Sequence, residues 1–155
     1  MNYETKAIYL TGKPGAGKTT FGRKLSEQFG WKYLEVDALG KAMEGVYVDI
    51  WDVVALLKPF FGGVVIIDHL SSIVPENREK LGAENEIMVF IEHENWGERY
   101  ERVYPGFPYP KKGDKKYRVW VEPFTKGKIC NNTLYIRSDK DERLVIEKLK
   151  EWVLK

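Results

Sequence analysis

One glycine-rich segment near the N-terminus constrains the fold of this chain more than any other feature. Residues 12–19 read GKPGAGKT and match the pattern G-x-x-x-x-G-K-[ST]. An apolar run, Ala7–Leu10, precedes the segment, and Phe21, Leu25 and Phe29 follow it at helical spacing. The chain is therefore predicted to form a strand, a tight loop and a helix, in that order.

A loop of this kind can hold the phosphates of a nucleotide. Its glycines let successive backbone N–H groups face a polyphosphate, and the N-terminus of the following helix attracts the same anion. Lys18 is expected to reach the β- and γ-phosphates of ATP, and the Thr19 hydroxyl to bind Mg²⁺. The alternative is a chance match in a glycine turn, which the strand before the loop and the helix after it disfavour. The candidate nucleotide-binding residues are Gly12, Lys13, Pro14, Gly15, Ala16, Gly17, Lys18, Thr19 and Thr20.

The rest of the chain alternates strand and helix signals. Five strands separated by helices imply an α/β fold with a three-layer, doubly wound, mainly parallel five-stranded sheet. Ligands of such sheets bind at the carboxyl ends of the strands. The predicted strands are residues 7–10, 32 to 36 or 37, 64–67, 87–91 and 133–136. The predicted helices follow residue 17, cover residues 50–57 and 75–81, and begin after the capping residues Asn95 and Ser138.

Composition indicates a single globular domain over residues 1–155, with a lid or basic insert at about 105–130. The chain is 43% hydrophobic, and at this length it can bury a core without disulfides or a structural metal. Its one cysteine, Cys130, is typical of a reducing compartment, so a cytoplasmic location is predicted. The net charge of +2 is too small for the whole surface to bind nucleic acid or a membrane, and no apolar stretch is long enough to span a bilayer.

With this loop and this order of elements, the chain resembles the P-loop kinases, among them the adenylate, shikimate, gluconate and adenylylsulfate kinases. The resemblance implies the sheet order 2-3-1-4-5. It also implies that an acidic residue at the end of the second strand orients or deprotonates the acceptor hydroxyl, and Asp37 occupies this place. Glu35-Val36-Asp37 is similar to the D-x-D pattern of the family, with both acids on one side of the strand. The alternative for both carboxylates is a solvated acid at a strand end.

Asp68 directly follows the apolar run Val64–Ile67, a pattern typical of the strand that carries a magnesium-binding carboxylate. Asp68 is therefore predicted to hold Mg²⁺ together with Thr19. The segment Asp68-His69-Leu70-Ser71 is somewhat similar to the D-x-H segment of adenylate-kinase-like ATPases that act in ribosome assembly, but here the histidine adjoins the aspartate. His69 is expected to cap the strand.

Two arginines, Arg99 and Arg102, project from one side of the predicted fourth helix. In the P-loop kinases, arginines at the start of a mobile lid neutralise charge on the moving phosphoryl group. The resemblance therefore implies this role for one of the two. The alternative is a pair of solvated arginines that balance Glu98 and Glu101.

A basic and aromatic segment follows at Lys111–Lys128. It holds seven basic residues against two acids, together with Tyr117, Trp120 and Phe124. Three interpretations are open: a lid over an anionic acceptor, a patch that binds RNA by stacking and phosphate contacts, or a solvated loop with its aromatic residues anchored in the core. The lid is the favoured interpretation.

Together these features predict a small P-loop kinase, a phosphotransferase that uses ATP and Mg²⁺ and moves the γ-phosphate to a small, anionic or nucleotide-like acceptor. The alternative is a nucleotide-switched ATPase or binding module that docks RNA or a protein partner through Lys111–Lys128. The candidate catalytic residues are Lys18, Asp37, Arg99 and Arg102, and the candidate metal ligands are Thr19 and Asp68.

Overall fold

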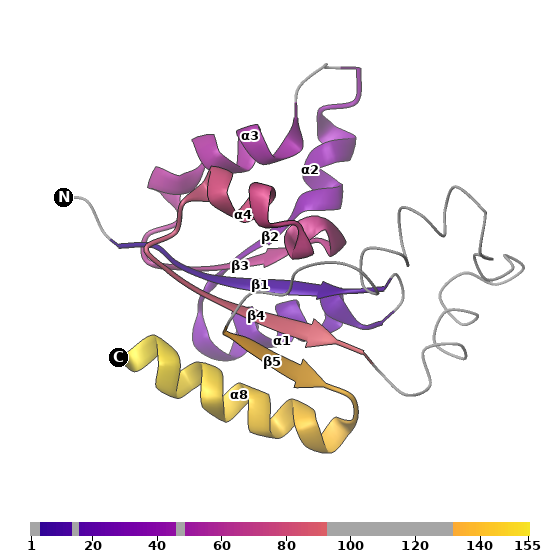
Figure 1. Ribbon diagram of the computed structural model, residues 1–155, viewed down its shortest axis with the longest axis vertical. Helices are drawn as coiled ribbons and strands as arrows, with labels where there is room; N and C mark the ends of the chain where they lie inside the picture. Colours follow the sequence, from indigo (N-terminus) through magenta and orange to yellow (C-terminus); the bar gives the residue numbers. More distant parts are fainter. Residues whose placement is uncertain (1–3, 14–15, 46–48, 93–131) are drawn as a thin grey trace, which may run out of the picture.

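The computed structural model describes residues 4–13, 16–45, 49–92 and 132–155. Its centre is a parallel five-stranded sheet in the order β2-β3-β1-β4-β5 (Figure 1), as predicted from the sequence. The strands are β1 (Lys6–Gly12), β2 (Lys32–Glu35), β3 (Val64–Asp68), β4 (Asn85–Ile91) and β5 (Thr133–Ile136). The helices are α1 (Lys18–Phe29), α2 (Val36–Ala42), α3 (Ile50–Leu56), α4 (Pro75–Leu81) and α8 (Asp139–Leu154), with the short 3₁₀ helices η1 (Lys58–Phe60) and η2 (Leu70–Ile73).

The central strand β1 is buried on both faces. Ile8 and Leu10 belong to the core cluster that includes residues of α1 and α8, whereas Ala7 and Tyr9 belong to the cluster that includes residues of α2, α3 and α4. Figure 1 shows these two layers of helices on opposite sides of the sheet. The three-layer prediction is confirmed, because a strand with a continuous apolar run, here Ala7–Leu10, must be covered on both faces.

Local sequence sets several helix ends. Gly30 ends α1 in the left-handed conformation with φ of 72°, and Pro75 begins α4. Ser138 caps α8, since its side-chain oxygen accepts the N–H of Asp141 at 3.3 Å. These ends agree with the sequence pattern because each depends on residues within a few positions of the helix terminus.

The second strand is shorter than predicted. β2 ends at Glu35, and Val36 and Asp37 form the first turn of α2. Val36 is 1% exposed and packs in the core cluster of α2, α3 and α4. A single buried apolar residue fits a strand end and a first helical turn equally well, so the pattern could not distinguish them.

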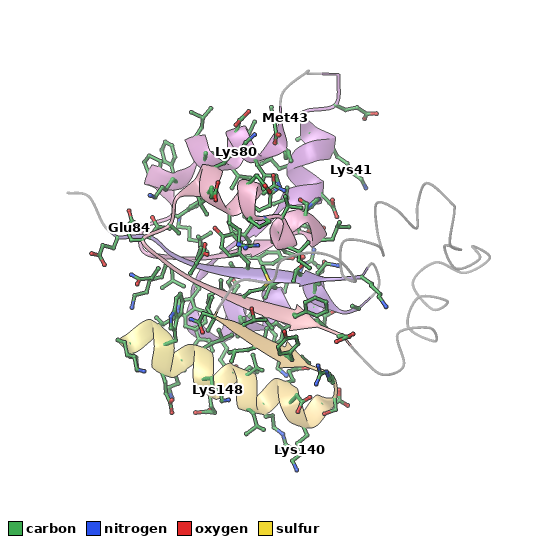
Figure 2. The ribbon with its side chains drawn as sticks, viewed as in Figure 1. Lys41, Met43, Lys80, Glu84, Lys140 and Lys148 are labelled. Carbon is green, nitrogen blue, oxygen red and sulfur yellow. The ribbon has the colours of Figure 1, made fainter. Side chains whose placement is uncertain are left out.

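Several charged side chains lie on the outer surfaces of the helices (Figure 2). Lys80, labelled in Figure 2, joins α4 to α3 through ion pairs with Asp49 at 3.0 Å and Asp52 at 3.1 Å. Lys140 and Lys148 are exposed on α8, and Lys140 points away from the sheet (Figure 2). None of the described helices is both long and apolar enough to cross a membrane.

All five strands run in one direction, so their carboxyl ends lie at one edge of the sheet (Figure 1). Gly12 ends β1 and Asp68 ends the neighbouring strand β3 at this edge. Helices α1 and α2 begin just beyond the ends of β1 and β2. The candidate site is assembled from these four chain segments.

Candidate active site

Backbone geometry at two glycines fits a loop that wraps around an anion. Gly12 has φ of 148°, and a Cβ there would lie 2.5 Å from the carbonyl oxygen of Ile91 in β4. Gly17 has φ of 102° and directly precedes α1. The N–H of Ala16 donates to the carbonyl of Lys13 at 3.1 Å. The chain therefore turns sharply onto the N-terminus of a helix, where backbone N–H groups and the helix dipole stabilise an anion.

The Lys18 ammonium group lies close to the loop and to two carboxylates. Its Nζ donates to the carbonyl oxygens of Gly12 at 3.0 Å and Lys13 at 3.2 Å. Burial lowers the pKa of Lys18 from its ordinary value, while the negative charges of Asp68 and Asp37 oppose that shift. The fields of both predicted acids therefore act on the predicted phosphate-binding lysine.

Thr19 and Asp68 form an oxygen pair that suits a magnesium ion. Thr19 Oγ1 donates to Asp68 Oδ2 at 3.1 Å, which joins α1 to the end of β3. Asp68 is only 4% exposed, and a buried carboxylate requires a cation or hydrogen-bond donors. Mg²⁺ takes hard oxygen ligands and commonly uses one or two protein oxygens beside phosphate and water. The oxygen atoms of Thr19 and Asp68 therefore fit the ion, and the described residues hold no cluster of three or more His, Cys, Asp or Glu side chains that could bind a metal.

Tyr33 contacts this pair and was missed by sequence reasoning. Its hydroxyl donates to Asp68 Oδ2, and burial together with this hydrogen bond raises the pKa of Tyr33 above its ordinary value. The ring lies against α1 at Gly22, where an added Cβ would overlap Tyr33 Cε2. Alternation along β2 could have placed Tyr33 on the α1 side of the sheet. The sequence carries no signal for the contact between its hydroxyl and Asp68.

Asp37 lies in the first turn of α2, where His69 is its partner. The His69 Nε2 and Asp37 Oδ1 atoms are 3.0 Å apart. This hydrogen bond holds the pKa of Asp37 below its usual value, although partial burial acts in the opposite direction. The Asp37 side chain is 74% exposed and so is accessible to a ligand. His69 follows β3 as expected, but its side chain caps η2 and contacts Asp37.

Glu35 does not accompany Asp37. The similarity to a D-x-D pattern predicted both carboxylates on one side of an extended strand, but only Glu35 belongs to β2. Glu35 Oε2 instead lies 3.7 Å from the Nη2 atom of Arg23 on α1. The D-x-D interpretation is therefore wrong in its geometry, because the chain turns into α2 between the two acids.

A hollow of about 180 Å³ lies beside the loop, between the beginning of α1 and the carboxyl ends of β4 and β5. Thr20, which was predicted to bind the nucleotide, is exposed and forms part of the wall. Apolar side chains line the hollow together with the polar side chains of Thr20 and Glu142, a combination typical of small-molecule sites. The lining residues are Ala16, Gly17, Thr20, Phe21, Ile91, Ile136 and Glu142.

Some predicted residues lie outside the described part of the chain. These are the loop residues Pro14 and Gly15, the arginines Arg99 and Arg102, and the basic segment Lys111–Lys128. Their roles stay predictions. Lys18, Thr19, Asp68 and Asp37 come together at one edge of the sheet, whereas Thr20 and Ala16 face the neighbouring hollow.

A model of the ATPase family associated with various cellular activities (AAA) matches residues 8–99. The chain belongs to this family of P-loop ATPases. It is also 34% identical over 77 residues to a protein from Thermococcus onnurineus (strain NA1) named "Putative adenylate kinase". That match covers 44% of this chain and only 43% of the relative, so the chain spans less than half of the relative's length.

Solved structures of small kinases share the fold of this P-loop protein. A shikimate kinase from Acinetobacter baumannii, in complex with shikimate, aligns with a TM-score of 0.60 at 21% identity, over 97% of this chain and 93% of that one. A gluconokinase from Sinorhizobium meliloti 1021 aligns with a TM-score of 0.59 at 18% identity, over 99% and 98% of the two chains. The chain therefore has the fold of the small P-loop kinases, as the resemblance implied.

Proposed function

We propose that this P-loop protein is a small kinase, which transfers the γ-phosphate of ATP to a small, anionic or nucleotide-like acceptor in a Mg²⁺-dependent reaction. The observation that carries the proposal is the position of Lys18 near two carboxylates from different segments, Asp68 and Asp37. Asp68 is buried beside Thr19, whereas Asp37 is largely exposed. An enzyme that only hydrolyses ATP needs a metal-binding carboxylate such as Asp68. A kinase also needs an accessible carboxylate such as Asp37, which can orient or deprotonate the acceptor hydroxyl.

Each of the described site residues has a separate role in phosphoryl transfer. The loop that ends at Gly17 binds the phosphates, and Lys18 offsets their negative charge. Thr19 and Asp68 would hold Mg²⁺, which when bound neutralises charge on the β- and γ-phosphate oxygens. Asp37 orients the acceptor hydroxyl or takes up its proton. Positioning and electrostatics of this kind account for most of the catalysis in phosphoryl transfer.

Three further assignments complete the proposal. Arg99 or Arg102 offsets charge on the moving phosphoryl group, and the segment at about 105–130 covers an anionic acceptor. The protein acts in the cytoplasm, in keeping with its single cysteine, Cys130. All three derive from the sequence and the family resemblance.

The test is a panel of acceptors offered with ATP and Mg²⁺. ADP formation by the purified chain is measured with AMP, shikimate, gluconate or adenylylsulfate, and without any acceptor. We expect one acceptor to stimulate ADP formation strongly and to yield a stoichiometric phosphorylated product. Asp37→Asn should lose this stimulation but still bind ATP in calorimetry, because Asp37 serves the acceptor.

Two outcomes would contradict the proposal. If no acceptor stimulates turnover but RNA or a partner protein does, the chain is a nucleotide-switched ATPase. If Asp37→Asn keeps the full stimulation by the acceptor, Asp37 has no part in the transfer. Calorimetry with ATP and Mg²⁺ on the unmodified chain checks the nucleotide site independently.

A further inference from the structure

The side chain of His69 connects the end of β3 to the beginning of α2. Its Nε2 lies 3.0 Å from Asp37 Oδ1. The histidine side chain is 18% exposed and that of the aspartate 74%. The histidine is therefore the enclosed member of the pair, and the aspartate is the member that solvent and ligands reach.

The hydrogen bond at the other ring nitrogen of His69, Nδ1, shows which nitrogen carries the ring proton. The backbone N–H of Ser71 donates to His69 Nδ1 at 3.0 Å. A backbone N–H can only donate, so Nδ1 must present a lone pair and the ring proton must be on Nε2. His69 Nε2–H therefore donates to Asp37, and the direction of this hydrogen bond follows from the main chain of η2.

Buried side chains hold the imidazole in this orientation. The indole Nε1–H of Trp51, a residue 2% exposed in α3, donates to Ser71 Oγ at 2.9 Å. Ser71 Oγ in turn contacts His69 Nδ1. The Trp51 and His69 rings also meet edge to face, with centroids 6.5 Å apart. The main-chain N–H of His69 donates to the carbonyl of Leu10 in β1 at 3.3 Å, which fixes its backbone.

By contrast, α2 has few attachments of its own. The helix has seven residues, and Val36 is its only buried one. A helix this short gains little stability from its own backbone hydrogen bonds, so its position depends on tertiary contacts. The hydrogen bond from His69 to Asp37 is one such contact in its first turn.

We propose that His69 is a positioning residue for phosphoryl transfer, which holds Oδ1 of Asp37 through Nε2–H so that this carboxylate meets the acceptor in a fixed orientation. The inference rests on the proposed function of Asp37. Trp51 in the core contacts Ser71, Ser71 contacts His69, and His69 binds Asp37. These contacts restrain the exposed catalytic carboxylate of Asp37. Misplacement of a reacting group by 1 Å can lower a rate about a hundredfold, so this restraint should be visible in the kinetics.

Two substitutions separate this role from simple capping of η2. In His69→Asn, the amide oxygen can still accept the Ser71 N–H, because asparagine is a good N-cap residue, but the side chain is too short to reach Asp37. In His69→Gln, the amide nitrogen reaches about as far as Nε2 and can donate to Asp37, while the cap is weakened. If His69 positions Asp37, His69→Gln should preserve activity better than His69→Asn. If His69 only caps η2, the order should be reversed.

The kinetic assay uses the member of the acceptor panel (AMP, shikimate, gluconate or adenylylsulfate) that the unmodified chain phosphorylates. We expect His69→Asn to lower kcat/KM for the acceptor at least about tenfold, with the KM for ATP changed less than about twofold. His69→Gln should recover much of that loss. Lys41→Gln is the matched control, because Lys41 lies on α2 and acts on Asp37 by charge without a direct bond. It should stay within about twofold of the unmodified chain.

A spectroscopic measurement tests the contact whether or not an acceptor is found. The chain has only two histidines, so ¹⁵N-histidine labelling with the His69→Asn variant assigns the His69 ring signals. We expect the neutral Nε2–H form, and a shift of that signal in Asp37→Ala. An Nδ1–H form, or a signal unmoved by Asp37→Ala, would overturn the positioning role. Failure of every acceptor with an intact His69 signal would instead overturn only the proposed kinase function.

Discussion

Replacement of Gly22 by alanine should destabilise the protein, although alanine is the better helix former. Gly22 is an interior residue of α1, where the glycine-to-alanine change alone is worth about 1 kcal/mol in favour of the helix. The added Cβ would overlap Tyr33 Cε2 and lie 3.0 Å from Leu10 Cδ1. The Tyr33 ring cannot simply swing away, because its hydroxyl is bonded to Asp68.

The net effect is the difference between the two contributions. Overpacking a well-filled site costs about 1–3 kcal/mol. After the gain of about 1 kcal/mol in helix propensity is subtracted, Gly22→Ala should lower the free energy of unfolding by up to about 2 kcal/mol. The displaced ring should also loosen the hydrogen bond between Tyr33 and Asp68.

Two comparisons isolate the clash. Gly40→Ala in α2 is the matched control, because an added Cβ at Gly40 meets no atom within 4 Å. It should leave stability unchanged or raise it by up to about 1 kcal/mol. In a Tyr33→Ala background, Gly22→Ala should likewise become stabilising. The coupling energy from this double-mutant cycle should be about 1–3 kcal/mol.

Urea unfolding followed by circular dichroism gives all of these free energies. If Gly22→Ala stabilises the protein as much as Gly40→Ala does, Tyr33 does not lie against α1 as described. If the double-mutant cycle gives no coupling between the two positions, any destabilisation arises elsewhere and the same reasoning fails.

Three further predictions concern the loop, the core and pH. Lys18→Ala should abolish ADP formation yet leave the urea midpoint nearly unchanged, because its charge serves the nucleotide; normal turnover would refute this. Leu149→Ala, at a fully buried position of α8, should cost about 2–5 kcal/mol in urea unfolding, and a loss below about 1 kcal/mol would mean that α8 is not packed on the sheet. The Thr5 N–H and the Lys58 ammonium group hold the pKa of Glu84 below its ordinary value. These contacts of Glu84 therefore stabilise the folded protein fully above about pH 4.3, the ordinary glutamate pKa. Their contribution is lost as pH falls through the lower pKa that Glu84 has in the folded protein. Thermal midpoints of the unmodified chain and Glu84→Gln should differ at pH 7 and converge in acid, and a constant difference would count against these contacts.

Fold and loop were predictable because both depend on short-range signals. Continuous apolar runs predicted strands buried on both faces, and the chain has such runs at β1, β3 and β4. The pattern of residues 12–19 predicted a loop between strand and helix, and Gly12 and Gly17 have the positive φ angles that the loop requires. The position of Asp68 at the end of β3 was predictable, because an acid directly after an apolar run lies at the carboxyl end of a parallel strand.

The surroundings of Asp37 were not predictable in the same way. Its place in a helix depends on a turn after Glu35 that one apolar residue, Val36, could not signal. The contact with His69 joins residues 32 positions apart in the chain, through an adjacency of β2 and β3 that exists only after the sheet forms. The same adjacency brings the Tyr33 hydroxyl to Asp68.

The amino-acid sequence by itself determined the phosphate loop, the parallel α/β sheet and the acid that ends the third strand. Each depends on residue types within a few positions of one another. Such a local pattern can be recognised without knowledge of how the rest of the chain packs. Only the tertiary structure decided which side chains surround the two carboxylates. Side-chain contacts between strands and helices distant in sequence are set by how the layers pack, and no local pattern records that packing.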